Sequence, residues 1–253
     1  MTATLLCFTA VALEMVLLGR AVRGKLLKRY KFFYCYLAVV LVGDLFLLCI
    51  YHLYPRIYAP AYWGTELIGV LVGCGLVWEV YKIAFARYPG ASHVARDTLI
   101  LVFIFAISRV LVEASGNPNW TIGRSTLETE LSLRTVQTAL LAGLVILFAY
   151  YEIPLGRNLK GIIYGYGLFL VTSIANLTLR NDLGSSFQHI WETIQPACYI
   201  LVLFGWCLTL WSYSPVPDQE SEPRLEADYR ALVARTRAKL RSTRARLLKD
   251  IRP

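Results

Sequence analysis

The chain has 253 residues, of which 57% are hydrophobic and 17% are charged, and its mean hydropathy is +0.51. Soluble domains carry about 25% charged residues, so this composition excludes an ordinary soluble domain and predicts an integral membrane protein. The net charge of +9 does not indicate nucleic-acid binding, because the long apolar runs could not stay in water and no nucleic-acid-binding motif accompanies them.

Seven apolar runs in the sequence are long enough for membrane-spanning helices. A helix needs about 20 residues, at about 1.5 Å each, to cross about 30 Å of hydrocarbon. We therefore predict an all-α seven-helix transmembrane bundle within residues 1–214. The expected helices are 4–19, 32–54, 65–85, 98–114, 131–151, 161–179 and 187–211. The first run has no basic residues before it, so we expect it to remain as a helix rather than be removed as a signal peptide.

The orientation follows from the distribution of basic residues between the predicted loops. One side of the bundle carries 21 of the 26 lysines and arginines, and the other side carries four, with Arg109 inside the membrane. By the positive-inside rule, the N-terminus is outside and the C-terminus is cytoplasmic. Tyr54, Tyr58, Tyr62 and Trp63 fit an outer interfacial belt. We expect the protein in the inner (plasma) membrane of a bacterium.

Arg109 and Glu113 are ionisable residues inside an apolar run. Their i,i+4 spacing places both on one face of a helix. Asp44, in the second predicted helix, lies about 20 Å from the cytoplasmic face, close to the depth of about 18 Å expected for Arg109. Asp44 is therefore the predicted counter-ion of Arg109. Ionisable residues inside a membrane indicate a functional site with a partner.

Other polar residues lie near the outer ends of the later helices: Glu130, Arg134, Gln137, Asn176, Arg180, Glu192 and Gln195. With the residues above they predict a polar layer in the outer half of the bundle. One interpretation is a ligand-binding or ion-binding site, and the other is a set of structural ion pairs that fix helix packing. The predicted ligand-binding residues are Asp44, Arg109, Glu113, Glu130, Arg134, Glu192 and Gln195.

A second, smaller set of carboxylates lies in the inner half of the predicted bundle. Glu14 and Glu79 lie about 18 Å and about 21 Å from the outer face. Glu79 can pair with Lys82, three residues further on. A proton or ion path through Glu14, Glu79 and Asp44 is the corresponding hypothesis.

The chain changes character after residue 214. Residues 215–223 form a proline-containing acidic linker, and residues 224–253 form a basic segment whose apolar residues recur every three or four positions. This pattern predicts a cytoplasmic amphipathic helix that lies on the anionic leaflet of the membrane or associates with a protein partner or a second copy. The predicted docking residues are Arg230, Arg235, Arg237, Arg241 and Arg244.

The sequence lacks the residues and motifs of several common cofactor-binding and catalytic sites. Rhodopsins share the predicted topology, but no lysine occurs between Lys160 and Lys239, where the last helix would need one for a retinal Schiff base. Metalloprotease HExxH, Walker A and Rossmann motifs are absent. His52 and His189 leave bis-histidine haem ligation geometrically possible, but we predict no cofactor and no metal.

The sequence therefore predicts a non-enzymatic multi-pass membrane protein. It is expected to be a receptor-like or sensor-like binding module, or a structural subunit of a membrane complex, that signals or docks through its cytoplasmic tail. The alternative is a small-solute or proton-coupled transporter or channel that uses Asp44, Glu14 and Glu79. The sequence does not identify the ligand.

Overall fold

A computed structural model describes most of the chain as helices. The described residues are 2–24, 26–86, 122–151, 155–214 and 224–250, together with residues 88, 92–93, 96–97, 99–101, 103–104, 108 and 112. Side chains are described for the same residues except 2–4, 122–129, 180–192, 224–226 and 241–250. No strand occurs among these residues, so the described part of the chain is all-helical.

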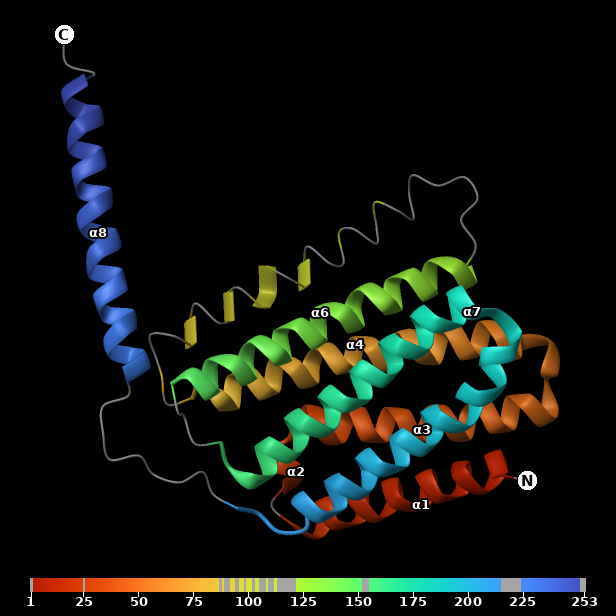
Figure 1. Ribbon diagram of the computed structural model, residues 1–253. Coiled ribbons are helices and arrows are strands. Elements are labelled where there is room, and N and C mark those ends of the chain that lie inside the picture. Colours follow the sequence, from red (N-terminus) through yellow and green to blue (C-terminus); the bar gives the residue numbers. More distant parts are fainter. Residues whose placement is uncertain are drawn as a thin grey trace.

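The elements in chain order are long helices joined by short connections (Figure 1). They are α1 (Thr2–Arg23), α2 (Leu26–Arg29), α3 (Lys31–Leu53), the 3-10 helix η1 (Pro55–Ile57), α4 (Tyr58–Ala84), α6 (Ile122–Tyr150), α7 (Arg157–Thr209) and α8 (Arg224–Asp250). Figure 1 shows α8 projecting away from the bundle that the other helices form.

Five helical segments in the described residues are long and apolar enough to cross a membrane. They are Leu5–Arg23, Lys31–Leu53, Pro55–Ala84, Glu130–Tyr150 and Arg157–Leu179, and a shorter apolar segment, Thr193–Thr209, follows them. The five longer segments agree with five of the seven runs expected from hydropathy, and Thr193–Thr209 covers part of a sixth, 187–211. The number of seven spans and the orientation stay predictions. The remaining run, 98–114, falls largely outside the described residues. The fold is that of a helical membrane protein.

Helix α7 folds back on itself, as its course in Figure 1 shows. Its first arm, Arg157–Leu179, packs against its second arm, Thr193–Thr209, in antiparallel fashion. Trp206 Nε1 in the second arm donates a hydrogen bond of 3.1 Å to the carbonyl of Gly161 in the first. A Cβ at Gly165 would collide with the Trp206 ring, so glycine permits the close approach of the two arms.

The bundle is held together by contacts between neighbouring helices. α1 packs on α3 and α7, α3 on α4, α4 on α6, and α6 on α7. Fully buried Phe33, Leu37, Leu76 and Trp206 form part of the core between them. Many large apolar side chains, such as Phe8, remain exposed on the outer surface. An apolar surface of this kind suits contact with lipid rather than water.

At the end of the bundle away from the N-terminus, hydrogen bonds of Glu79 and Asn158 connect neighbouring helix ends. Glu79 Oε2 accepts a hydrogen bond of 3.0 Å from the backbone N–H of Phe33, and it thereby caps the first turn of α3. Asn158 Nδ2 donates to the carbonyls of Thr209 and Ser212 at 2.9 and 2.8 Å, which ties the end of the second arm of α7 to the start of the first.

Candidate ligand-binding site

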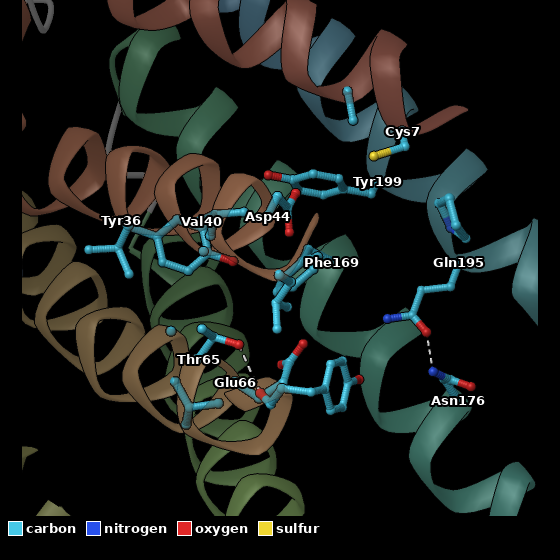
Figure 2. A pocket seen from close by; sticks show the side chains of 18 of the residues that line it. Cys7, Tyr36, Val40, Asp44, Thr65, Glu66, Phe169, Asn176, Gln195 and Tyr199 are labelled. Atoms are coloured by element: carbon cyan, nitrogen blue, oxygen red, sulfur yellow. Dashed lines mark hydrogen bonds between the residues drawn. The ribbon is translucent and has the colours of Figure 1, made fainter. Parts of the chain in front are cut away.

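The described bundle contains a cavity of about 580 Å³ at the end where the N-terminus lies; we call it the pocket (Figure 2). Its walls come from α1, α3, α4, α6 and both arms of α7. Small-molecule pockets have volumes of about 300–1,000 Å³ and are mostly apolar with a few polar groups. The pocket has the size and composition of such a site.

Two carboxylates face the pocket from different helices. Asp44 on α3 and Glu66 on α4 both line it, and in Figure 2 their side chains point into the same space from opposite sides. They are close enough to repel each other electrostatically. Asp44 makes no hydrogen bond or ion pair with any residue that the structure describes. It is half-buried, so a negative charge faces the pocket without a partner from the described bundle.

Arg134 on α6 is held between two carboxylates. Its Nη2 lies 2.8 Å from Oε2 of Glu66 and 2.7 Å from Oε1 of Glu130, one turn earlier on α6. The side chains of Arg134 and Glu130 are 7% and 4% exposed, so this is a buried charge network. Its guanidinium also lies 5.3 Å from the centre of the Phe169 ring. The guanidinium is thus shared between the two carboxylates.

Gln137, one turn after Arg134, joins α6 to α4 and α7 beside the pocket. It is fully buried, and its Nε2 donates to the carbonyl of Val70 at 3.0 Å. The hydroxyl of fully buried Tyr166 donates to Gln137 Oε1 at 2.9 Å. A side chain at Gly73 would collide with the Tyr166 hydroxyl, so glycine leaves room for this bond. The polar groups of Gln137 and Tyr166 are therefore satisfied within the protein.

The two arms of α7 are joined at the pocket by Asn176 and Gln195. Asn176 Nδ2 donates a hydrogen bond to Gln195 Oε1, and both residues line the pocket (Figure 2). Pro196 follows directly and lies inside the helix. Proline removes a backbone hydrogen-bond donor and clashes with the preceding turn, so it weakens regular helix at this position.

Glu14 on α1 lies behind the pocket wall. It is fully buried, and its Oε1 accepts a hydrogen bond from the hydroxyl of Tyr199, which lines the pocket. Its other oxygen, Oε2, has no hydrogen-bond partner among the described residues. Glu14 also interacts electrostatically with Asp44, so it adds to the negative field at the pocket.

Aromatic side chains form much of the pocket wall. The seven that line it are Tyr36, Tyr51, Tyr58, Tyr62, Tyr166, Phe169 and Tyr199. Several of their rings touch one another in a continuous wall. The Phe169 ring centre lies 6.1 Å from that of Tyr166 and 5.7 Å from that of Tyr199, and Tyr36 lies 5.4 Å from Tyr166.

The structure brings together part of the predicted ligand-binding set. Asp44, Arg134 and Gln195 line the pocket, and Glu130 contacts Arg134. Arg109 and Glu113 lie outside the described residues, and so does the side chain of Glu192. The predicted pairing of Asp44 with Arg109 therefore stays a prediction.

Glu66 and the aromatic wall were not among the sequence-predicted site residues. Glu66 lies two turns into α4, close to the end of the bundle that also carries Arg134. A carboxylate and an arginine at similar depth in two predicted helices are the signal that could have suggested this pair. Nothing in the sequence indicated which faces of the tyrosine-bearing helices turn inward.

Glu79 lies far from Asp44, another member of the predicted proton path. It contacts Phe33, and Asp44 lies about 16 Å further along α3 from that residue. The pairing with Lys82 is visible only as an electrostatic attraction. The path through Glu14, Glu79 and Asp44 stays a prediction.

The predicted docking residues lie on α8. Arg230, Arg235 and Arg237 are exposed, and the side chains of Arg241 and Arg244 are outside the described part of the helix. Asp228 on α8 lies near Tyr151, the residue after α6, and burial together with this nearby carboxylate raises the pKa of Tyr151. The tail helix therefore contacts the end of α6 that lies away from the pocket.

Comparisons with known proteins give no match. No protein-family model, no curated protein and no solved structure is similar to the chain. Among the described side chains, no group of three or more His, Cys, Asp or Glu residues is arranged to hold a metal ion. The geometry of the pocket is thus the observation on which a functional proposal can rest.

Proposed function

We propose that the chain is a receptor-like or sensor-like membrane protein whose bundle binds a small molecule in the pocket. Asp44 is the observation that carries this proposal. Its carboxylate faces a cavity of about 580 Å³ and has no partner among the described residues, whereas Glu66 and Glu130 are paired with Arg134. An unpaired charge in an apolar bundle is costly, and in this proposal a ligand with a complementary group, rather than Arg109, supplies the partner.

We propose that the pocket opens toward the outside of the cell. The N-terminus and the η1 turn lie at the pocket end of the bundle, and the basic loop 20–31 and the basic tail lie toward the other end (Figure 1). Because cytoplasmic loops carry the excess of lysine and arginine, this distribution supports a pocket on the outer side.

We propose that α6 connects the pocket with the tail. Arg134 and Gln137 lie at its pocket end, and Tyr151 follows its other end and contacts Asp228 on α8. A shift of α6 on ligand binding would therefore reach the tail helix, whose exposed arginines suit an anionic membrane leaflet or an acidic protein partner. If the chain is instead a structural subunit, deletion of 224–253 removes a co-purifying partner, and no small molecule binds in the pocket.

A transporter is the second candidate, and Glu14 favours it. This carboxylate is fully buried behind the pocket wall, and one of its oxygens lacks a hydrogen-bond partner among the described residues. Buried carboxylates of this kind serve as proton sites in transporters. Uptake of a solute into proteoliposomes that depends on Glu14 and on a proton gradient would favour this candidate over the receptor.

A cavity-filling variant tests the proposed binding function. Gly69 lines the pocket, and a Cβ added there has no neighbouring atom within 4 Å, so we expect Gly69→Leu to extend into the pocket and fill it while the fold is kept. Gly167→Leu is the matched control, because Gly167 also has open space around it but does not line the pocket. The purified protein is screened in lipid nanodiscs against small molecules of positive, negative and no charge.

The expected result is a set of compounds that bind the unmodified protein and Gly167→Leu but not Gly69→Leu. The proposal fails if every compound that binds does so equally well to Gly69→Leu. It also fails if no compound binds while the protein remains folded and inserted.

A further inference from the structure

The charges around the pocket are unbalanced. The charged side chains in or beside it that the structure describes are four carboxylates and one guanidinium: Glu14, Asp44, Glu66, Glu130 and Arg134. The guanidinium already forms ion pairs with two of the carboxylates. When these carboxylates are ionised, the field that the described side chains create inside the pocket is negative, and a low-dielectric surrounding strengthens it.

The pocket wall adds a second, independent preference. Aromatic rings present a negative face, which attracts a cation placed over them within about 6 Å. Phe169 lies in Figure 2 between Asp44 on one side and Glu66 on the other, and Tyr36 and Tyr199 border the same space. Rings of this kind suit alkylammonium groups, which are bulky and weakly hydrated.

We propose that the pocket binds a small organic cation, an alkylated amine or a quaternary ammonium compound, between Asp44, Glu66 and the aromatic wall. The inference rests on the proposed binding function and names the chemical class of its ligand. Asp44 supplies the counter-charge, since Glu66 is already engaged by Arg134. The aromatic wall encloses the alkyl groups around the nitrogen.

Other charge classes fit the pocket less well. An anion would face an excess of carboxylates, and the only guanidinium among the described pocket residues is already paired with two of them. A bare metal ion requires several oxygen ligands at about 2–2.6 Å. The described side chains offer no such group, and a volume of about 580 Å³ is far larger than an ion needs.

Arg134 does not offer the ligand a donor through its Nε. Its Nη2 pairs with Glu66 and Glu130, and its Nε, which has no hydrogen-bond partner among the described residues, is buried within the protein and out of reach of the pocket. The expected ligand is therefore defined by its ammonium group and by the alkyl groups around the nitrogen.

A pair of probes with the same shape and different charge tests this inference. Acetylcholine combines a quaternary ammonium with a carbonyl oxygen, and dimethylbutyl acetate is its uncharged carbon analogue. Tetramethylammonium carries the same charge on a smaller molecule, and acetate serves as the anion. Binding of each probe to the full-length protein in nanodiscs is measured by calorimetry or by displacement of a fluorescent cation.

Three variants accompany the probes. Asp44→Asn removes the pocket charge with little change of shape, and Asp97→Asn removes an exposed charge that lies outside the pocket and pairs with Arg96. Gly69→Leu fills the pocket. Loss of one carboxylate charge at close range in a partly buried site should weaken the binding of a cation by about tenfold or more.

The inference predicts that acetylcholine binds more tightly than its uncharged analogue, and that tetramethylammonium binds more tightly than acetate. Asp44→Asn should weaken the binding of acetylcholine about tenfold or more and leave the binding of the uncharged analogue unchanged. Asp97→Asn should change the affinity for neither probe. If the uncharged analogue or acetate binds as tightly as the cations, or if Asp44→Asn has no effect, the cation is the wrong class. If Gly69→Leu abolishes that binding, the proposed binding function still holds and only the ligand class is wrong. If no probe is affected by Gly69→Leu, the proposed function and the ligand class are both wrong.

Discussion

The hydroxyl of Tyr199 donates a hydrogen bond to Oε1 of Glu14, and this bond joins the second arm of α7 to α1 across 185 residues of sequence. Glu14 is fully buried, and Tyr199 borders the pocket. The bond therefore stabilises the bundle and fixes one wall of the pocket at the same time.

Removal of that hydroxyl should destabilise the protein. Tyr199→Phe leaves a buried carboxylate without its donor, and loss of such a partner costs about 1–3 kcal/mol. The free energy of unfolding is measured by SDS titration in mixed micelles. Tyr164→Phe is the matched control, because Tyr164 is 58% exposed and should change stability little. In a Glu14→Gln background, Tyr199→Phe should cost less, since an amide is easier to leave unpaired. Equal costs in both backgrounds would contradict the coupling.

The Arg134 network makes a second prediction about stability. Arg134→Met leaves the carboxylates of Glu66 and Glu130 without their partner, and breaking a buried pair costs about 3–5 kcal/mol. Glu130→Gln in the Arg134→Met background should recover part of this loss, because it removes one uncompensated charge. Glu66→Gln alone should cost less than Arg134→Met, since Glu66 is 29% exposed and Arg134 keeps Glu130 as a partner. Unfolding transitions of the three variants decide the order.

Local features of the fold were predictable from the sequence. Hydropathy identifies each apolar helix separately, so the range of α3 follows closely from its apolar run. The start of α4 was predicted seven residues too late, at 65 instead of Tyr58, and α7 is helical through 180–186, where a loop was expected. The pair Glu130 and Arg134 was also predictable, because an i,i+4 spacing places two side chains on one face of a single helix.

Relations between helices were not predictable in the same way. Glu66 pairs with Arg134 because α4 packs against α6 with these residues at one level, and hydropathy does not determine which helices are neighbours. Tyr58 fits an interfacial belt by its position in the sequence, but the rotation of α4 turns it toward the pocket. Glu79 was interpreted as an intramembrane acid, and its bond to the Phe33 N–H shows a helix-capping role that depends on tertiary packing.

The fold of α7 back on itself gives a third prediction. A side chain at Gly165 would collide with the Trp206 ring, whereas one at Gly167 would meet open space. Gly165→Ala should therefore destabilise the bundle by about 1–3 kcal/mol through overpacking. Gly167→Ala should leave stability unchanged or raise it by about 0.5–1 kcal/mol, because alanine has the higher helix propensity. Equal stability of the two variants would contradict the close packing of the arms. The unfolding of both is compared in the same micelles.

The location of the two chain ends tests the orientation on which access to the pocket depends. We expect the N-terminus outside and the C-terminus in the cytoplasm, because 21 of the 26 lysines and arginines lie on one side of the predicted membrane. Green fluorescent protein fluoresces when it folds in the bacterial cytoplasm, and alkaline phosphatase is active only after export. A fluorescent protein fused after Pro253 should therefore fluoresce, and a phosphatase at the same position should be inactive. An active phosphatase there would place the tail outside and open the pocket to the cytoplasm, so that its ligand would be an intracellular compound. Replacement of Arg23, Lys28 and Arg29 by glutamine in the fusion should increase the fraction of inverted molecules, since these residues lie close to the ends of the first two membrane segments.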